Sequence, residues 1–326
     1  MQISALAKRH LFKTYKIPSL DLSAATMAQE LHPWSDQCTV NALMRKLAEN
    51  DGAMSFEAYH NHDNLYGRLQ LQWPTLLHVN RSFRACLLWP QIDLFTDLDM
   101  KSSHNHICQF LAQERGMVLV ELPKYLEPSY KSRFEMELMD QGLSRRDTKQ
   151  LWLSLLNSGS IHGWRHGLLK TYGGGLKISM SEALRSHLKK FREEVMCVRQ
   201  RVLEDERWAL RYQVLVNPGG RRKALGKERA CRRLWNAALT TVEARVIRDL
   251  EKLVDGGAAG GSAKVVMPSY DGLLIKHTAG GFDIEKLQHA WADVCRTEYA
   301  YHFPVEAKNL EDDLPGWVRR LTALAQ

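Results

Sequence analysis

The pattern of apolar and polar positions along the chain predicts several helices and two short stretches of strand. Helical patterns lie at about 40–50, 104–116, 124–158, 181–208 and 227–254. Strand patterns lie in 66–100 and 263–277, where apolar residues alternate with polar ones or form short runs bounded by Gly and Pro. The predicted strands and the predicted helices occupy separate stretches of the chain.

The block at 181–208 has the most regular helical pattern. Its apolar residues alternate four and three positions apart: Leu184, Leu188, Phe191, Val195, Val198 and Val202. This spacing produces one apolar stripe along a long helix. We expect the stripe to pack on the rest of the chain, in preference to forming a coiled-coil dimer.

The strand-like segment from Tyr66 to Met100 ends in two aspartates. We expect strands at Leu69–Trp73 and at the apolar runs Ala85–Trp89 and Ile92–Phe95. Asp97 and Asp99 follow, one residue apart, so both project to the same face of a strand. Two like charges on one face favour a bound cation. The alternative is that an aspartate caps the following helix, an interpretation that we favour for Asp97 but not for Asp99.

A second aspartate site lies in a predicted hairpin. Two apolar, β-rich runs, 263–269 and 273–277, flank Asp271-Gly272, and an Asp-Gly pair between such runs predicts a β-hairpin. The simple interpretation is that the turn requires Asp-Gly. The functional interpretation is that Asp271 presents a carboxylate near the tip of the hairpin.

Charge and composition narrow the function only slightly. The 326 residues include 45 Lys and Arg against 37 Asp and Glu, a formal charge of +8 that favours a polyanionic partner. We find no membrane-spanning apolar run and no secretory signal. The six cysteines are scattered without a CxxC pair, which argues against a zinc site or a disulfide framework. We therefore expect a cytoplasmic, or otherwise intracellular, protein that binds no membrane.

The histidine pairs do not predict a metal site. His104 and His106 are two residues apart and point to different faces of a helix. His162 and His166 have helical spacing, but three nearby glycines disfavour a helix there: Gly159, Gly163 and Gly167.

Five short motifs, in order, resemble those of DNA polymerase I-like (family A) enzymes and of the short palm polymerases of viruses, phages and plasmids. They are Tyr66-Gly67-Arg68-Leu69 before the palm, Arg81-Ser82-Phe83-Arg84-Ala85 ahead of motif A, Phe95-Thr96-Asp97-Leu98-Asp99-Met100-Lys101-Ser102 as motif A, Arg145-Arg146-Asp147-Thr148-Lys149 at the start of motif B, and Tyr270-Asp271-Gly272 as motif C. The helix with Arg233-Leu234-Trp235-Asn236 resembles the segment between motifs B and C. The resemblance covers about residues 66–280.

The resemblance implies an α+β fold class: a right-hand polymerase with a palm of antiparallel sheet plus helices and with helical fingers. Residues 1–65 would be a reduced thumb or accessory cap, 66–104 the first part of the palm and 105–229 the fingers. Residues 230–326 would complete the palm with the motif C hairpin and a C-terminal extension.

The resemblance also implies the roles of individual residues. Asp99 and Asp271 would hold two Mg²⁺ ions, with Mn²⁺ as a substitute and Asp97 as a third candidate ligand. The predicted nucleotide-binding residues are Arg145, Lys149, His104 and Leu153, with Lys149 also a candidate proton donor to pyrophosphate. The predicted nucleic-acid-binding residues are Arg68, Arg81, Arg84, Asn236 and Tyr270.

The implied function is a template-dependent DNA polymerase without a proofreading exonuclease. Its partners would be a primed DNA template and nucleoside triphosphates, with a helicase, primase or processivity factor as further candidates. The chain departs from the family at His104, where the family has a sugar-selecting Glu, and at Leu153 and Asn157, where it has an aromatic residue and a tyrosine. A single-subunit RNA polymerase or primase, or a non-catalytic nucleic-acid-binding protein, therefore stays open as an alternative.

Overall fold

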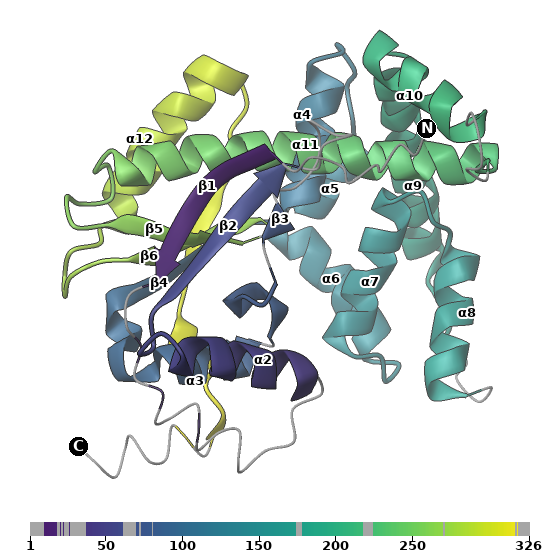
Figure 1. Cartoon of the computed structure of the whole chain (residues 1–326). Helices are drawn as coiled ribbons and strands as arrows, with labels where there is room; N and C mark the ends of the chain where they lie inside the picture. Colours follow the sequence, from purple (N-terminus) through teal and green to yellow (C-terminus); the bar gives the residue numbers. More distant parts are fainter. Residues whose placement is uncertain are drawn as a thin grey trace, which may run out of the picture. The chain divides into compact units, whose positions relative to one another are not determined.

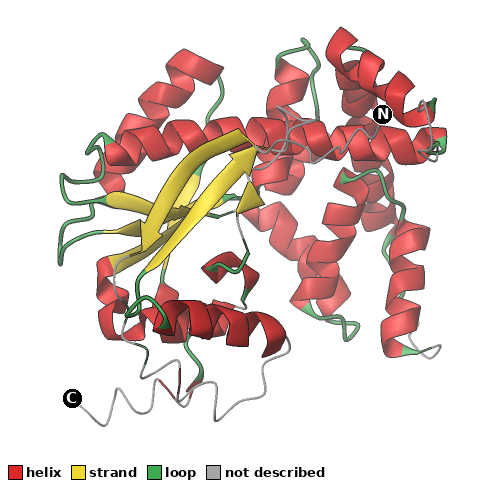
Figure 2. Ribbon diagram, in the orientation of Figure 1, coloured by secondary structure: helices red, strands yellow, loops and turns green. Residues whose placement is uncertain are grey.

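The computed structural model describes residues 10–17, 20, 22, 26, 37–60, 70–71, 73–79, 81–173, 178–217, 224–269, 271–316 and 318. They form a mixed α+β structure that is mostly helical and has two small antiparallel sheets (Figures 1 and 2). The chain divides into two compact units: unit 1 comprises residues 1–101 and 243–326, and unit 2 comprises residues 102–242. This division does not separate residues 1–65 from the predicted palm segments.

Both sheets belong to unit 1. The first has the order β1-β2-β3, formed by His10–Ile17, Met54–His60 and Gln70–Leu71. The second has the order β5-β6-β4-β7, formed by Lys264–Pro268, Gly272–Lys276, Phe95–Met100 and Val305–Lys308. β4 is therefore hydrogen-bonded on both edges, to β6 and to β7, and both pairings are antiparallel.

The two faces of the second sheet differ in chemistry. On one face Leu98 lies opposite Leu273 of β6 and Ala307 of β7, and the leucines are fully buried. On the other face lie Asp97 and Asp99, because side chains alternate along a strand. The apolar face anchors the sheet in unit 1, and the opposite face carries the charges.

The predicted hairpin is confirmed as β5 and β6, but Gly272 has a different role from the one expected. It is the first residue of β6 and is not among the described glycines with positive φ. A Cβ atom at this position would lie 2.1 Å from the Leu98 carbonyl oxygen and 3.0 Å from Asp99 Cα. The glycine is therefore required because β4 approaches closely, and not because the turn needs a left-handed residue.

Among the described residues of unit 1, four helices and three shorter 3₁₀ segments surround these strands. The helices are α2 (Gln37–Ala48), α3 (Arg81–Leu88), α12 (Ile284–Val294) and the C-terminal part of α11 (Lys227–Asp255), and the shorter segments are Leu76–His78, Trp89–Leu94 and Leu310–Asp313. In Figure 1, α2 and α3 lie on one side of the strands and α12 lies on the other. α12 continues into a π-helical turn, Cys295–Tyr299.

Two strand predictions in this region are wrong. The apolar run Ala85–Trp89 falls in α3 and the 3₁₀ turn that follows it, and Ile92–Leu94 belongs to the same turn. The strand prediction at Leu69–Trp73 is confirmed at Gln70–Leu71, which form β3, whereas Leu69 and Gln72 lie outside the described residues. A short apolar run does not by itself distinguish a buried strand from a buried helix, and α3 is buried along most of its length.

The first sheet is fixed to α11 by polar contacts. The Tyr15 hydroxyl donates to Glu251 Oε2 at 2.9 Å, and Lys13 forms ion pairs with Glu251 and Asp255. Burial, together with the Glu251 carboxylate, raises the pKa of Tyr15 well above its ordinary value, so this phenol stays protonated and donates. β1 is thereby fixed to the same unit as β4.

In the described part of unit 2, all regular secondary structure is helical. Its helices are α4 (Ser103–Gln113), α5 (Glu121–Leu126), α6 (Pro128–Met139), α7 (Arg145–Leu156), α8 (Ile161–Tyr172), α9 (Glu182–Leu203), α10 (Glu206–Val216) and the first part of α11. The six apolar residues of the α9 stripe are all fully buried, as predicted. α8 contradicts our expectation that nearby glycines prevent a helix there. No described helix is both long and apolar enough to span a bilayer.

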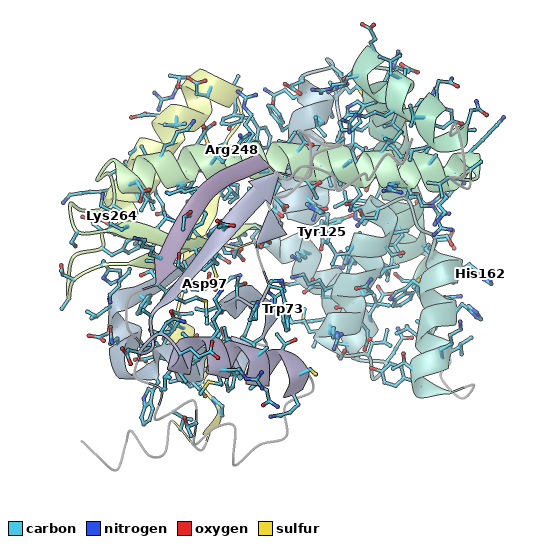
Figure 3. All side chains as sticks on the ribbon, in the orientation of Figure 1. Trp73, Asp97, Tyr125, His162, Arg248 and Lys264 are labelled. Carbon is cyan, nitrogen blue, oxygen red and sulfur yellow. The ribbon has the colours of Figure 1, made fainter. Side chains whose placement is uncertain are left out.

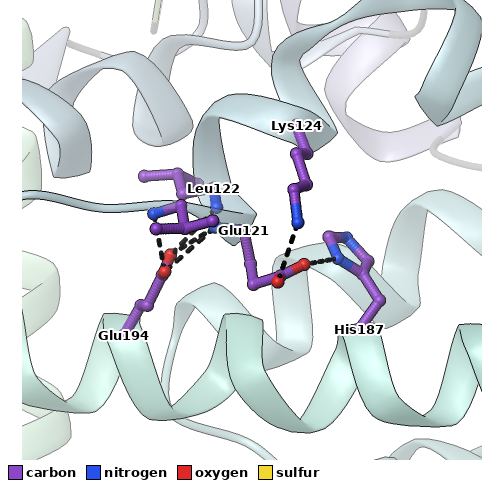
Figure 4. Close-up of polar contacts among 6 residues, drawn as sticks. Glu121, Leu122, Lys124, His187 and Glu194 are labelled. Atoms are coloured by element: carbon purple, nitrogen blue, oxygen red, sulfur yellow. Dashed lines mark hydrogen bonds and ion pairs between the residues drawn. The ribbon is translucent and has the colours of Figure 1, made fainter.

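A polar network lies inside unit 2 (Figure 4). The Glu194 carboxylate accepts the backbone N–H groups of Val120, Glu121 and Leu122, at 2.7–3.0 Å, and so caps the start of α5. Glu121 in turn bonds His187 and Lys124. Burial lowers the pKa of His187, so its neutral Nδ1–H donates to Glu121.

We predict that Gly272→Ala destabilises unit 1. The new methyl group meets backbone atoms of β4, which cannot move aside as a side chain can. The free energy of unfolding should fall by about 1–3 kcal/mol or more, the cost of overpacking. Gly261→Ala is the matched control, because nothing lies within 4 Å of a Cβ there. Chemical denaturation of the two variants measures the difference, and equal stabilities would contradict the close approach.

Candidate active site

Asp97 and Asp99 lie on β4, the central strand of the charged face. Asp97 is buried and lies between the strands and α3 (Figure 3), whereas Asp99 is half-buried. Neither caps the helix that follows: the N-cap of α4 is Ser102, in a left-handed conformation with φ 49°. The capping explanation for the aspartates therefore does not apply, and both carboxylates are presented by the sheet.

The sheet brings Asp271 next to Asp99 even though 171 residues separate them in the sequence. Asp99 is the register partner of Gly272, and the Met100 N–H donates to the Asp271 carbonyl oxygen at 2.7 Å. Asp271 lies in the connection before β6, outside the strand alternation that orients Asp99. Two acidic residues predicted from separate motifs thus lie within one residue of each other across β4 and β6.

Asp97 has its own buried partner. Arg84 Nη2 of α3 lies 3.5 Å from Asp97 Oδ2, and both side chains are less than a tenth exposed. Burial raises the pKa of Asp97, while the charge of Arg84 acts in the opposite direction. This geometry revises our expectation for Arg84: its guanidinium faces Asp97 in the interior and is not presented to a nucleic acid.

Lys308 and Glu306 are residues of the charged face that sequence analysis missed. Lys308 forms an ion pair with Asp99, and Lys101 forms one with Glu306 at 3.8 Å. A usable signal existed, because Val305-Glu306-Ala307-Lys308 alternates apolar with charged residues, as a half-buried strand does. That pattern places Glu306 and Lys308 on one face, but it does not identify β4 as the partner strand.

The carboxylates of Asp97, Asp99 and Asp271 suit a divalent ion that is held by few protein ligands. Among the described residues, no group of three or more His, Cys, Asp and Glu side chains is placed to hold one metal ion. Mg²⁺ commonly takes one or two carboxylates and completes its shell with water and substrate phosphates. Asp99 and Asp271 match that requirement. Asp97 suits it less, because Asp97 and its partner Arg84 are both buried, whereas Asp99 and its partner Lys308 are more exposed.

In unit 2 the predicted nucleotide-binding residues of α7 differ in exposure. Arg145 and Lys149 are exposed, whereas Leu153 is half-buried. Trp152 shares their helix but is buried in an aromatic cluster, with its ring 4.1 Å from that of Tyr125, centroid to centroid. α7 thus has an apolar side fixed in the helical core, and it has three cations available to solvent: Arg145, Arg146 and Lys149.

The other predicted site residues are dispersed. In unit 2, Asn236 of α11 donates to Asn157 at the end of α7, at 3.4 Å, and His104 is half-buried in the first turn of α4. In unit 1, Arg81 is exposed at the start of α3. Arg68 and Tyr270 lie outside the described residues.

The fold resembles that of a DNA polymerase. No protein-family model matches this sequence, and no curated protein matches it. Among solved structures, the polymerase domain of Pol1 from M. smegmatis, in complex with DNA primer-template and dNTP, matches with a TM-score of 0.53 at 15% sequence identity. The match covers 83% of this chain and 50% of the other, so the chain spans half the length of that protein chain. At this identity the likeness is one of fold.

We predict that Asp97→Asn costs stability because it leaves the Arg84 guanidinium buried without a counter-charge. Removing one partner of a buried pair typically costs about 3–5 kcal/mol. Urea denaturation of Asp97→Asn should show this loss, while Asp93→Asn, at an exposed position, should show almost none. The double variant Arg84→Met/Asp97→Leu should lose less than the sum of its single changes. Equal stability of Asp97→Asn and Asp93→Asn would argue against the pair.

Proposed function

We propose that the chain is a template-dependent DNA polymerase that extends a primer by two-metal phosphoryl transfer. The observation that carries the proposal is the pairing of β4 with β6. It puts Asp99 beside Asp271 in a fold similar to that of a polymerase domain. The exposed cations on α7 and the net positive charge of +8 suit polyanionic substrates.

In the proposed reaction the primer's 3′-oxygen attacks the α-phosphorus of a nucleoside triphosphate. The new P–O bond forms as the bond to the bridging oxygen of the β-phosphate breaks, and pyrophosphate leaves. In the same step the primer hydroxyl passes its proton to solvent water. When bound, the two Mg²⁺ ions would lower the pKa of that hydroxyl and neutralise charge on the phosphates.

Each residue of the chain has a distinct part in this proposal. Asp99 and Asp271 supply the carboxylates that hold the ions. Arg145 would bind phosphate oxygens through its forked guanidinium, and Lys149 would stabilise the leaving pyrophosphate and donate a proton to it. Asn236 and Arg81 would contact the template-primer, and Asp97 supports β4 through Arg84.

His104 bears on the choice of sugar. It stands where the resembled polymerases have a glutamate that excludes the ribose 2′-hydroxyl, so an RNA polymerase or primase is the alternative within the same chemistry. Imidazole is planar and can donate or accept a hydrogen bond, and we propose that His104 likewise excludes ribose. Preference of the wild-type chain for rNTPs over dNTPs on one primed template would favour the alternative.

We predict that Asp99→Ala and Asp271→Ala each reduce primer extension at least about a thousandfold while template binding persists, since phosphate contacts dominate that affinity. Primer extension and fluorescence anisotropy, with Mg²⁺, measure the two properties. Asp93→Ala removes an exposed carboxylate of unit 1 and is the matched control, expected to be fully active. Near wild-type extension by either site variant would contradict the two-aspartate mechanism.

A second prediction concerns the cations of α7. Arg145→Ala and Lys149→Ala should each lower kcat/KM for the nucleotide about tenfold or more, because a charge-assisted hydrogen bond to phosphate is lost. Template affinity at fixed salt should change little. Lys170→Ala, an exposed lysine of α8, controls for a general loss of positive charge. Loss of template binding with unchanged nucleotide kinetics would instead place α7 on the nucleic acid.

A further inference from the structure

The Asp99 carboxylate already has a cation beside it. The Lys308 ammonium of β7 forms an ion pair with Asp99 Oδ2, with the side chains 30% and 15% exposed respectively. The pairing joins two strands of the same sheet within unit 1. A proposed ligand of a divalent ion is therefore already in contact with a charged group of the chain itself.

The strand register shows that this contact is not forced by proximity alone. Lys308 lies directly opposite Asp97, not opposite Asp99. Its side chain reaches diagonally along β4, a distance that long side chains can span. Since Arg84 already serves Asp97, Asp99 is the carboxylate of this pair that lacks another described cation.

Three carboxylates near the Asp271 connection are already paired with cations of the chain. Each of three carboxylates has its own cation: Asp97 with Arg84, Asp99 with Lys308 and Glu306 with Lys101. A site for a divalent ion normally has an excess of negative charge, because carboxylates that repel one another gain most from the ion. At Asp99, the Lys308 ammonium supplies the positive charge that a divalent ion would otherwise supply.

We propose that Lys308 competes with the divalent ion for the Asp99 carboxylate. In the metal-free protein the Lys308 ammonium pairs with this carboxylate, and it must move away when the ion binds. The ammonium and the ion need the same carboxylate, and their like charges repel at contact distance. The β7 lysine thereby sets the metal concentration at which the site fills. This inference rests on the proposed function only in taking Asp99 as a metal ligand.

Mn²⁺ binding to the full-length chain, followed by the electron paramagnetic resonance signal of the free ion, tests the proposal without any need for catalysis. Lys308→Met should bind Mn²⁺ at least about tenfold more tightly than wild type, because this variant lacks the positive charge that pairs with the Asp99 carboxylate. Lys308→Gln, which keeps a hydrogen-bond donor, should behave likewise and replaces the methionine variant if that variant fails to fold.

Lys101→Met is the matched control. It removes one positive charge from the same face, but that ammonium pairs with Glu306 and its side chain is 57% exposed, so Mn²⁺ affinity should change less than about threefold. Adding Asp99→Asn to Lys308→Met should abolish the gain. Unchanged Mn²⁺ affinity in both Lys308 variants, or an equal gain in Lys101→Met, would overturn the proposal.

The outcomes separate this inference from the proposed function. Tighter, Asp99-dependent Mn²⁺ binding by the Lys308 variants in a chain that extends no primer would support the competitor and reject the polymerase. Asp99-dependent primer extension by the wild type, with no gain in Mn²⁺ affinity in the Lys308 variants, would support the polymerase and reject the competitor.

Discussion

The antiparallel pairing of β4 with β6 on one edge and β7 on the other is the constraint on which the candidate site depends. It draws together three segments that are far apart in the sequence, and it gives them one apolar and one charged face. On the apolar face, buried leucines pack together and stabilise the sheet, and this stabilisation does not depend on the charged residues of the other face. The charged face can therefore bring carboxylates close together, because the stability of the sheet is supplied by the other side.

The charged face is organised by pairs whose members differ in burial. Asp97 and Arg84 are both buried, so their pairing is costly to break and fixes α3 against the sheet. Asp99 and Lys308 are more exposed, so water can replace either partner at lower cost. Within one short strand the structure thus combines a fixed ion pair with an exchangeable one, and only the exchangeable pair lies beside the connection that carries Asp271.

The spacing of apolar residues predicted the long α9 helix and the hairpin correctly. Short local patterns predicted the wrong element where contacts between distant segments determine the structure. The α9 stripe and the β5–β6 hairpin follow from spacing alone, because each buries a face that its own sequence defines. Ala85–Trp89 reads as a strand but is helical, since a short buried run has no distinguishing period. Asp99 and Asp271 could be chosen from motifs. Lys308 could not, because its role depends on which strand β7 joins.

The same pairing limits how the chain can change in length. Since side chains alternate with a period of two, inserting or deleting one residue within β4 would turn every following side chain of the strand to the opposite face. Asp99 would then point into the leucine layer, and an apolar neighbour would replace it among the charges. Insertions or deletions of two residues keep each side chain on its face, but the close approach of the Leu98 carbonyl oxygen still requires a glycine at position 272. The site therefore tolerates many substitutions in β4, but few insertions or deletions of a single residue.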